Sequence, residues 1–327
     1  MSKLKLAIIG AGVMAKRHLG VLALMEDITV VGITSRTLSK AQVLATEYGI
    51  SVCAPTIEEM IRQCHPDALL VLVSEDQTEQ VVSAIMAYRL PLFIEKPPGL
   101  NLQQAEGLAD LARRFNVMNM VGFNRRYYSV FHQGLDLIKK HGRLLGIAIQ
   151  GHERIWLQHQ ATDKHFLDTI LPNWIYANST HTIDLIRFFA GEPQELKILS
   201  RSIKEPCGDQ FVAAMSFANG TLGTYQAHWY SPGGWMVALY GEGITVEFKP
   251  LEKGIWIDQE FKSHDIVPQE MDVRFRSGLF AQMRAFINLA KNKEKAWPLS
   301  DLEDSLKTMR LAEKFKEQVQ DAILLNE

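Results

Sequence analysis

A glycine-rich loop near the start of the chain restricts the fold more than any other feature. Residues 4–9 are a short apolar run typical of a buried strand, and the segment Gly10-Ala11-Gly12-Val13-Met14-Ala15 follows it directly. The spacing G-x-G-x-x-A between a strand and a helix is typical of a dinucleotide-binding domain. Gly10 allows the tight turn, Gly12 lets the backbone approach a pyrophosphate, and Ala15 lets the helix pack closely. We therefore predict a Rossmann domain in which the loop and the helix N-terminus bind the cofactor, through Gly10, Gly12, Val13 and Met14.

Strand and helix signals alternate through the first 123 residues. The strands are apolar without alternation, which is typical of a parallel sheet covered by helices on both faces. Right-handed connections then give a doubly wound α/β domain. The predicted strands are residues 4–9, 28–34, 68–73, 92–94 and 117–122, and the predicted helices are residues 15–25, 39–48, 57–63, 78–88 and 102–115.

The hydrophobic pattern changes after residue 123. Later strand-like runs alternate between apolar and polar residues, which predicts a mostly antiparallel open sheet with one face in contact with solvent. We therefore divide the chain into a Rossmann domain, residues 1–123, and an α+β domain, residues 124–327, whose C-terminal helices can pack back on the first domain. The predicted strands are residues 145–150, 196–202, 211–217, 221–228, 237–240 and 245–248, and the predicted helices are residues 180–190, 277–291 and 301–319.

Composition excludes several classes of partner. The 327 residues carry a net charge of -2, so there is no basic field to attract nucleic acid. No apolar run approaches the roughly 20 residues of a membrane span. The cysteines are three and separate, which indicates reduced thiols, and we expect a cytoplasmic protein. The spacing of four histidines matches no pair of metal ligands, so we expect no metal; these are His152, His159, His165 and His228.

The end of the second predicted strand bears on the choice of cofactor. An acidic residue there binds the ribose 2′-hydroxyl of NAD, but this chain has Thr34-Ser35-Arg36. Arg36 can pair with a 2′-phosphate, with Ser35 beside it. We expect NADP or NAD, with NADP favoured. The alternative is that Arg36 is a solvated arginine after a strand.

A lysine follows the strand at residues 92–94, in Glu95-Lys96-Pro97-Pro98. The carboxyl end of that strand faces the expected cofactor crevice. A lysine there can hydrogen-bond the oxygen of an alcohol or carbonyl that undergoes hydride transfer. The charge of an oxidised nicotinamide and the exclusion of water would lower the lysine pKa, so that Lys96 accepts or returns a proton. The alternative is a surface lysine in a proline-rich turn.

With these motifs the sequence resembles the Gfo/Idh/MocA oxidoreductase family, which includes glucose–fructose oxidoreductase and inositol dehydrogenase. The resemblance runs from about Leu4 to about Leu251. Its carriers are the segments at residues 7–15, Phe93-Ile94-Glu95-Lys96-Pro97, Val121-Gly122-Phe123-Asn124-Arg125-Arg126-Tyr127 and His181-Thr182-Ile183-Asp184.

The resemblance implies a set of roles. Lys96 would be the catalytic lysine, with Pro97 after a cis peptide bond, and Glu95 and Ser74 would lie beside the nicotinamide ribose. Asn124 and Arg125 would line the crevice between the domains, while His181 and Asp184 would face the substrate. The second domain would bind substrate and form a homodimer or homotetramer through its open sheet. Substrates in the family are mostly sugars, polyols and sugar nucleotides.

One position departs from the family pattern. The family has an aspartate four residues before the histidine, and here that residue is Ala177. Asn178, Ser179 or Thr180 can cap a helix, which would place His181 in the first turn, where the helix dipole disfavours imidazolium. His181 would then accept a proton, with Asp184 on the same helix face to orient the ring or to bind a sugar hydroxyl. The alternative is a structural histidine at a helix start.

These observations leave three functions open. The first is an NAD(P)-dependent dehydrogenase or reductase acting on a sugar or polyol, with Arg154 and Trp174 as further substrate contacts. The second, motivated by Ala177, is a cofactor-sensing regulatory protein without catalysis. The third is a redox-neutral enzyme that uses tightly bound NAD(P).

Overall fold

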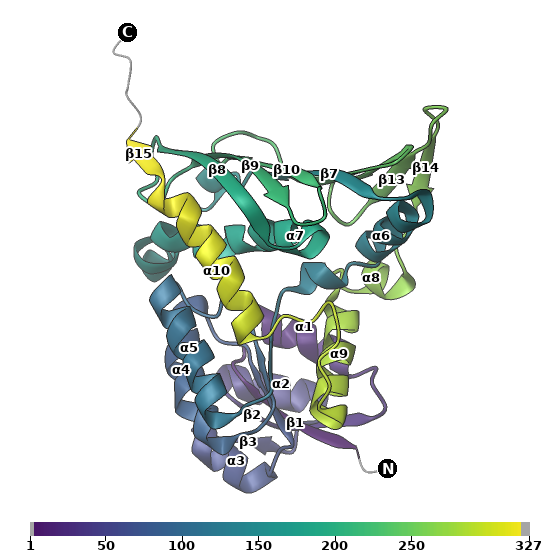
Figure 1. Ribbon diagram of the computed structural model, residues 1–327. Coiled ribbons are helices and arrows are strands. Elements are labelled where there is room, and N and C mark those ends of the chain that lie inside the picture. The colour runs from purple at the N-terminus through teal and green to yellow at the C-terminus, as the bar shows by residue number, and fades with distance from the viewer. Residues whose placement is uncertain (1–2, 322–327) are drawn as a thin grey trace. The chain divides into compact units, whose positions relative to one another are not determined.

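A computed structural model describes residues 3–321 of the chain. These residues form two compact units (Figure 1). The first, the parallel-sheet unit, contains residues up to Asn124 together with Met271–Leu306. The second, the mixed-sheet unit, contains Arg125–Glu270 and the chain from Lys307 onward.

The parallel-sheet unit is built on six strands in the order β3-β2-β1-β4-β5-β6, all paired in parallel. This is the strand order of the Rossmann fold, in which the order reverses between β1 and β4. The carboxyl ends of β1 and β4 therefore lie together at the point where ligands bind in such sheets. The strands are β1 (Leu4–Ile9), β2 (Ile28–Thr34), β3 (Val52–Cys53), β4 (Ala68–Val71), β5 (Leu92–Ile94) and β6 (Asn119–Val121).

Helices cover both faces of the parallel sheet. Helices α4 and α5 pack together on one side, and α1 and α9 pack together on the other (Figure 1). The helices are α1 (Val13–Leu22), α2 (Leu38–Tyr48), α3 (Ile57–Cys64), α4 (Thr78–Ile85), α5 (Leu102–Phe115) and α9 (Leu279–Asn292), with 3₁₀ turns η1 (Glu75–Gln77) and η2 (Met86–Tyr88). The 3₁₀ turn η3 (Asn124–Tyr127) and helix α8 (Glu270–Arg274) each contain a point at which the chain passes from one unit to the other. Because both faces are covered, the side chains of β4, β5 and β6 are all buried.

The segment around α9 is part of the parallel-sheet unit although it is distant in the sequence. Phe286 of α9 packs edge to face against Phe93 of β5, with ring centres 5.6 Å apart. The amide of Val121 on β6 donates to the carbonyl of Ser300, and the Asn119 side chain accepts from the Leu302 amide at 2.7 Å. The outermost strand β6 is therefore held by a segment that follows it by about 180 residues.

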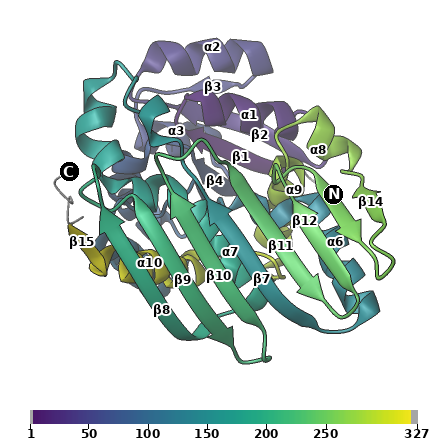
Figure 2. The ribbon, with the colours of Figure 1, turned by 90° about the horizontal axis from the view of Figure 1, so that it is seen from above.

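The mixed-sheet unit has nine strands in the order β14-β13-β12-β11-β7-β10-β9-β8-β15. Most pairs are antiparallel, and the exceptions are the parallel pairs β7–β10 and β8–β15. Figure 2 shows one face of this sheet from above, with β8, β9, β10, β7 and β11 running side by side. The strands are β7 (Leu144–Gly151), β8 (Pro193–Ser202), β9 (Gln210–Phe217), β10 (Leu222–His228), β11 (Trp235–Gly241), β12 (Ile244–Phe248), β13 (Gly254–Ile257), β14 (Ser263–Ile266) and β15 (Val319–Asp321).

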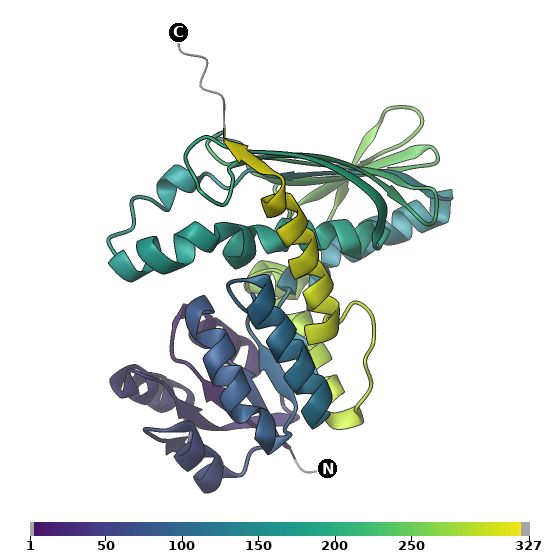
Figure 3. The same cartoon turned by 60° about the vertical axis from the view of Figure 1, so that its left-hand side comes forward.

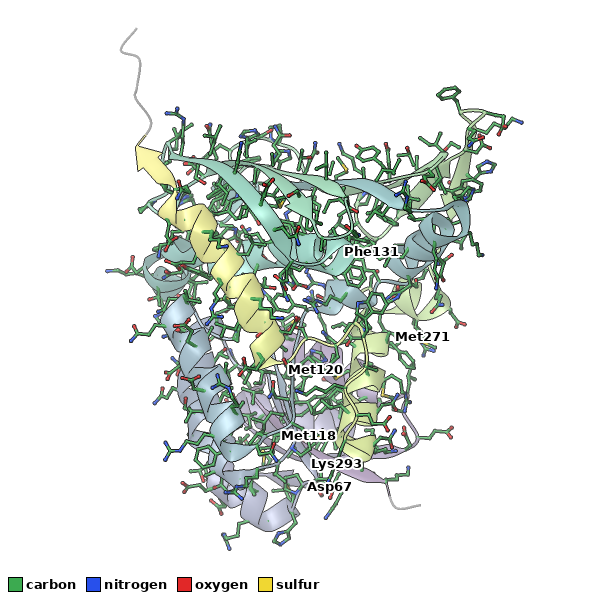
Figure 4. The ribbon with its side chains drawn as sticks, in the orientation of Figure 1. Asp67, Met118, Met120, Phe131, Met271 and Lys293 are labelled. Carbon is green, nitrogen blue, oxygen red and sulfur yellow. The ribbon has the colours of Figure 1, made fainter. Side chains whose placement is uncertain are left out.

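The other face of this sheet is covered by helices α6 (Ser129–His141) and α7 (Thr180–Ala190), as the turned view makes clear (Figure 3). Phe131 of α6, labelled in Figure 4, packs against Phe248 and Phe189 in an aromatic core. Helix α10 (Leu302–Glu317) carries Phe315, which packs against Phe211 and Tyr225 of the sheet. Between β7 and α7 the chain forms short non-α helices: η4 (Ile155–Leu157), η5 (Phe166–Ile170), η6 (Leu171–Asn173) and η7 (Ile175–Ser179).

The predicted α/β fold with a second, mostly antiparallel sheet is confirmed, and most strands and helices lie within a few residues of their predicted bounds. Six elements were not predicted from the sequence: α6, α8, β3, β13, β14 and β15. No helix among residues 3–321 is both long enough and apolar enough to cross a membrane.

Candidate functional site

The glycine loop joins β1 to α1 through a backbone conformation that depends on glycine. Gly10 has φ +114°, and a Cβ atom there would lie 2.2 Å from the carbonyl oxygen of Leu72. At Gly12 a Cβ atom would meet no atom within 4 Å. Gly12 is also the residue that precedes α1, and no side chain caps this helix. The loop therefore has an open space at an uncapped helix N-terminus, which is the arrangement that binds a phosphate.

A groove of about 430 Å³ runs along the carboxyl edge of the parallel sheet and starts at this loop. It is lined by the glycine loop, the end of β2, the start of α2 and the segment after β4. Of the predicted cofactor residues, the structure brings Gly10, Gly12, Ser35, Arg36 and Ser74 into this one groove. The open loop and the adjoining groove fit an extended dinucleotide.

Two basic residues lie at the β2 end of the groove. Arg36 follows β2, and Lys40 lies in the first turn of α2; both line the groove. Lys40 was not predicted from the sequence, although its spacing of four residues from Arg36 at a helix start was a usable signal. Two cations in this position suit a ligand with an additional phosphate.

Glu95 and Lys96 follow β5 at the same carboxyl edge. The Glu95 amide donates to the Val71 carbonyl of β4, and the Lys96 amide donates to Glu95 Oε2 at 3.0 Å. Burial raises the pKa of Glu95 to about 7, against the opposing effects of the Lys96 charge and amide and of the Arg276 charge. The Lys96–Pro97 peptide is cis, as the resemblance implied. Lys96 thus stands beside a carboxyl group that changes charge near neutral pH.

Asn124 has a structural contact in the parallel-sheet unit. Its side-chain nitrogen donates to the Ser277 carbonyl at 3.0 Å, and the residue is buried. Val13 and Met14 begin α1, where the Val13 side chain is exposed and the Met14 sulfur contacts Arg17.

The prediction that a cap starts the helix of His181 was wrong. Helix α7 continues directly from the π-helix η7, so its first turn is not a free N-terminus. The Ser179 hydroxyl donates to Glu153, and the Thr180 hydroxyl donates to the Tyr176 carbonyl at 2.7 Å. The helix-dipole reason for a neutral His181 therefore has no support in the structure.

His181 belongs to a cluster with Arg125 and Trp235 in the mixed-sheet unit. The Trp235 ring lies 5.9 Å from the His181 ring, and the Arg125 guanidinium carbon lies 4.3 Å from the centre of the same indole. All three come from different elements: η3, β11 and α7. Their arrangement combines an imidazole, which is a side chain able to transfer protons, with a cation and an aromatic surface.

Asp184 has different surroundings from those expected for a substrate ligand. It is 1% exposed, and its carboxylate accepts from both Nε and an Nη of Arg126, at 2.7 and 2.6 Å. Thr308 donates to the same carboxylate at 2.7 Å. These contacts make Asp184 the centre of a buried network that holds α7 to η3 and α10.

The remaining predicted contacts lie on the loop between β7 and α7. Arg154 is exposed and has φ +52°. Trp174 is buried, with its ring 6.0 Å from that of Phe166 in an edge-to-face arrangement. Beside them lies Glu153, a buried residue that was not predicted from the sequence and that accepts hydrogen bonds from Asn178 and Ser179.

The described residues contain no group of three or more His, Cys, Asp or Glu side chains arranged to hold a metal ion.

The strand order, the glycine loop and the groove define a protein of the dinucleotide-binding oxidoreductase class. Residues 4–123 match the family described as "Oxidoreductase family, NAD-binding Rossmann fold", and residues 150–247 match the GFO/IDH/MocA C-terminal domain. The chain belongs to the Gfo/Idh/MocA family.

Similar proteins cover almost the whole chain. A 4-carboxy-2-hydroxymuconate-6-semialdehyde dehydrogenase from Sphingobium is 22% identical, with 84% of this chain and 91% of the relative covered. A myo-inositol 2-dehydrogenase from Thermotoga maritima is 22% identical, with 89% of each covered. The solved structure of an oxidoreductase from Agrobacterium radiobacter, in complex with NAD+, L-tartaric acid and magnesium, has a TM-score of 0.79 at 16% identity, with 97% of this chain and 96% of that chain covered. The structural likeness establishes the fold.

Proposed function

We propose that the protein is an NADP-preferring oxidoreductase that transfers a hydride between nicotinamide and a hydroxyl or keto carbon of a sugar, polyol or related acid. The single observation that carries this proposal is the groove that starts at Gly10 and Gly12 and contains Arg36 and Lys40, with Lys96 on the same sheet edge. The substrate class rests on relatives that are named as dehydrogenases of inositols and other hydroxyl compounds.

Lys96 is the proposed proton acceptor. When bound, the nicotinamide group accepts or supplies the hydride. Lys96 hydrogen-bonds the substrate oxygen, takes the hydroxyl proton as the alcohol becomes a carbonyl, and returns it in the reverse direction. Glu95 is held against the Lys96 backbone by the hydrogen bond described above, and its ionisation near pH 7 changes the field at Lys96.

His181 is the second residue proposed to handle a proton, and Arg125 and Trp235 are proposed substrate contacts. An indole face suits the apolar face of a sugar ring, and a guanidinium suits hydroxyl or carboxylate oxygens. Asp184 is proposed as a positioning residue that acts through Arg126, because its carboxylate oxygens already accept hydrogen bonds from Arg126 and Thr308.

The test is the near-UV absorbance of the nicotinamide, with NADP or NAD and a panel of sugars, inositols, sugar acids and sugar nucleotides. We expect turnover in the wild-type protein and a loss of at least 100-fold in Lys96→Ala, with cofactor binding retained. Lys16→Ala is the matched control, because Lys16 is an exposed lysine paired with Glu47. Unchanged turnover in Lys96→Ala would remove the proposed role.

Cofactor preference has its own test. Arg36→Ala and Lys40→Ala should each weaken NADP binding about tenfold or more while leaving NAD binding within about twofold, because only NADP carries the 2′-phosphate. Titration of both cofactors by isothermal calorimetry measures the effect. Equal losses for NAD and NADP would contradict the preference.

The two other functions are outcomes of the same assay. Cofactor binding without turnover across the panel, in both directions, would favour the cofactor-sensing protein. Conversion of substrate without a net change in cofactor absorbance would favour the redox-neutral enzyme.

We further propose that a second copy of the chain covers the open face of the mixed sheet, giving a homodimer or a homotetramer. Apolar side chains are exposed there, with Leu199 75% and Leu222 64% exposed, and a shallow groove includes Leu199 and Val212. Such a patch is typical of an interface. Sedimentation velocity should show an oligomer for the wild type and a monomer for Leu222→Glu.

We assign the protein to the cytoplasm because its three cysteines are free thiols.

A further inference from the structure

The mixed-sheet unit contains a buried carboxylate beside the position at which the family pattern has an aspartate. That position is Ala177, a buried residue of η7. Glu153, from the loop after β7, accepts hydrogen bonds from Asn178 and Ser179, the two residues that follow Ala177 in η7. Asn178 Nδ2 donates to its Oε2 at 2.5 Å, and Ser179 Oγ donates to its Oε1 at 2.7 Å.

The backbone around Glu153 holds its side chain inward. Strand β7 ends at Gly151, where a Cβ atom would lie 2.6 Å from the Tyr225 hydroxyl and 2.8 Å from Thr182 Oγ1, so only glycine allows this close approach to α7 and β10. Three residues on, Arg154 is exposed and has φ +52°, and the Ile155 amide donates to the Trp229 carbonyl at 3.0 Å. Glu153 is left 7% exposed between these two fixed points.

Glu153 differs from Asp184, another buried carboxylate of the mixed-sheet unit, in the kind of donor that holds it. Asp184 is paired with the Arg126 guanidinium. The hydrogen bonds to Glu153 come from a neutral amide and a neutral hydroxyl. A buried carboxylate without such a paired cation keeps more of its influence on other charges nearby.

The charged and titratable side chains that interact with Glu153 belong to the cluster of His181 and to β10. The Arg125 charge favours its ionised form, and Tyr225 of β10 has its pKa raised by burial first and by the charge of Glu153 as a further cause. Arg125 in turn contacts the Trp235 ring that packs on His181. Burial nevertheless raises the pKa of Glu153 above its usual range. One local group therefore links Glu153, Arg125, Trp235 and His181.

We propose that Glu153 is a positioning residue which replaces the carboxylate missing at position 177: it fixes the turn that carries His181 and supplies the negative charge that favours a protonated imidazole. This inference rests on the proposed function, because it assigns Glu153 a part in the proton handling of that reaction.

The decisive variants move the charge without changing the shape. Glu153→Gln keeps the shape and one acceptor oxygen, replaces the other oxygen by an amide nitrogen that can donate to the Ser179 hydroxyl oxygen, and removes the charge. Combining it with Ala177→Asp returns a carboxylate at the family position. Glu205→Gln is the matched control, since Glu205 is a second buried glutamate of the same unit, held by His159 and Tyr230.

NMR titration of the His181 imidazole tests the proposal without any substrate, so failure of the proposed function does not affect it. We expect the His181 pKa to fall by half a unit or more in Glu153→Gln, because a nearby negative charge stabilises imidazolium. It should recover in the double variant and stay unchanged in Glu205→Gln. An unchanged pKa in a folded Glu153→Gln protein would overturn the proposal, and Glu153→Met, which is uncharged and of similar length, serves in its place if Glu153→Gln does not fold.

Turnover gives the second readout. Glu153→Gln should lower kcat about 100-fold with little change in the KM for cofactor, and should shift the acidic limb of the pH profile to lower pH. Recovery of kcat by Ala177→Asp would support the proposal. A drop in kcat that Ala177→Asp does not reverse, with the acidic limb unmoved, would mean that Glu153 is only structural and would also overturn it.

Discussion

The two units build their candidate sites by opposite means. In the parallel-sheet unit the groove depends on side chains that are absent: Gly10 passes close to Leu72, and Gly12 leaves open space. In the mixed-sheet unit the cluster around His181 depends on buried polar side chains that hold one another, above all Asp184 with Arg126 and Glu153 with Asn178. Sites of the first kind are disturbed by added atoms, and sites of the second kind by lost partners.

The largest expected effect is on the buried ion pair of the mixed-sheet unit. Asp184→Ala leaves the Arg126 guanidinium, which is 6% exposed, without the carboxylate that binds it. We expect a loss of about 3–5 kcal/mol in the free energy of unfolding, since removal of one partner leaves a buried charge uncompensated. Urea denaturation measures it. Asp184→Asn, which keeps the shape and one acceptor, should lose less; equal losses would contradict the role given to the charge.

The next effect sharpens the contrast within the glycine loop. Gly10→Ala places a Cβ against Leu72 at φ +114°, so we expect a loss of about 1–3 kcal/mol in stability together with weaker cofactor binding. Gly12→Ala adds a Cβ where the protein has space, so stability should change by less than about 1 kcal/mol while cofactor binding is weakened. Thermal unfolding with and without NADP separates the two results. A stable Gly10→Ala protein would refute the strain.

These glycines also show what the sequence predicts well. The loop, the strand before it, the helix after it and the end of the helix at residue 48, just before Gly49 with φ +66°, were predicted because each depends on a local pattern. Helix α6 was missed, and it contains Gly134, which interrupts its helical signal. The structure gives the reason: a Cβ at Gly134 would lie 2.5 Å from the Phe248 ring. The need for that glycine comes from a residue over 100 positions away.

The residues of the candidate site also differ in whether a local sequence pattern could predict them. Arg36 was found because it follows the second strand of the dinucleotide-binding pattern, where the cofactor ribose is expected, whereas Ser74 was implied only by the family resemblance; both line the groove. Glu153 was missed because a glutamate after an alternating strand is typical of a solvent-facing residue. Its burial depends on Asn178, Ser179 and the turn at Arg154, and that pairing of segments carries no local signal.

A buried histidine tests whether polar groups are equally well partnered in the parallel-sheet unit. His18 of α1 is fully buried beside Phe93, and neither ring nitrogen has a hydrogen-bond partner in the part of the chain that the structure describes. Burial lowers its pKa from 6.5 to about 3. Below pH 6.5 the unfolded chain therefore binds a proton at His18, whereas the folded chain does not bind it until about pH 3. The free energy of unfolding consequently falls as pH falls through this window.

At pH 5 this linkage costs the wild type about 2 kcal/mol relative to pH 8. His18→Leu should remove that part of the acid sensitivity and leave the remaining carboxylate effects. Denaturation curves at pH 8 and pH 5 for both proteins measure it. An identical loss in both proteins would show that His18 is partnered or hydrated in solution.

The smallest effect on stability is expected at an exposed ion pair, which depends neither on a missing side chain nor on a buried polar partner. Asp27 contacts Lys291 and Arg284 of α9, and these contacts lower its pKa to about 2, with Lys291 the largest cause. The stabilisation is present above about pH 4 and is lost as pH falls through 2. Because the groups are solvated, Asp27→Asn should cost less than about 1 kcal/mol, and 1 M salt should abolish the difference.

The hydrogen bonds between β6 and the segment of Ser300 and Leu302 have a consequence for synthesis on the ribosome. The first 124 residues leave the exit tunnel long before the residues that pack against β5 and pair with β6. During that interval Phe93 and the edge of β6 lack their final partners, so the parallel sheet cannot complete its packing until almost the whole chain has been synthesised. Chaperone occupancy should accordingly persist until about residue 306 has emerged.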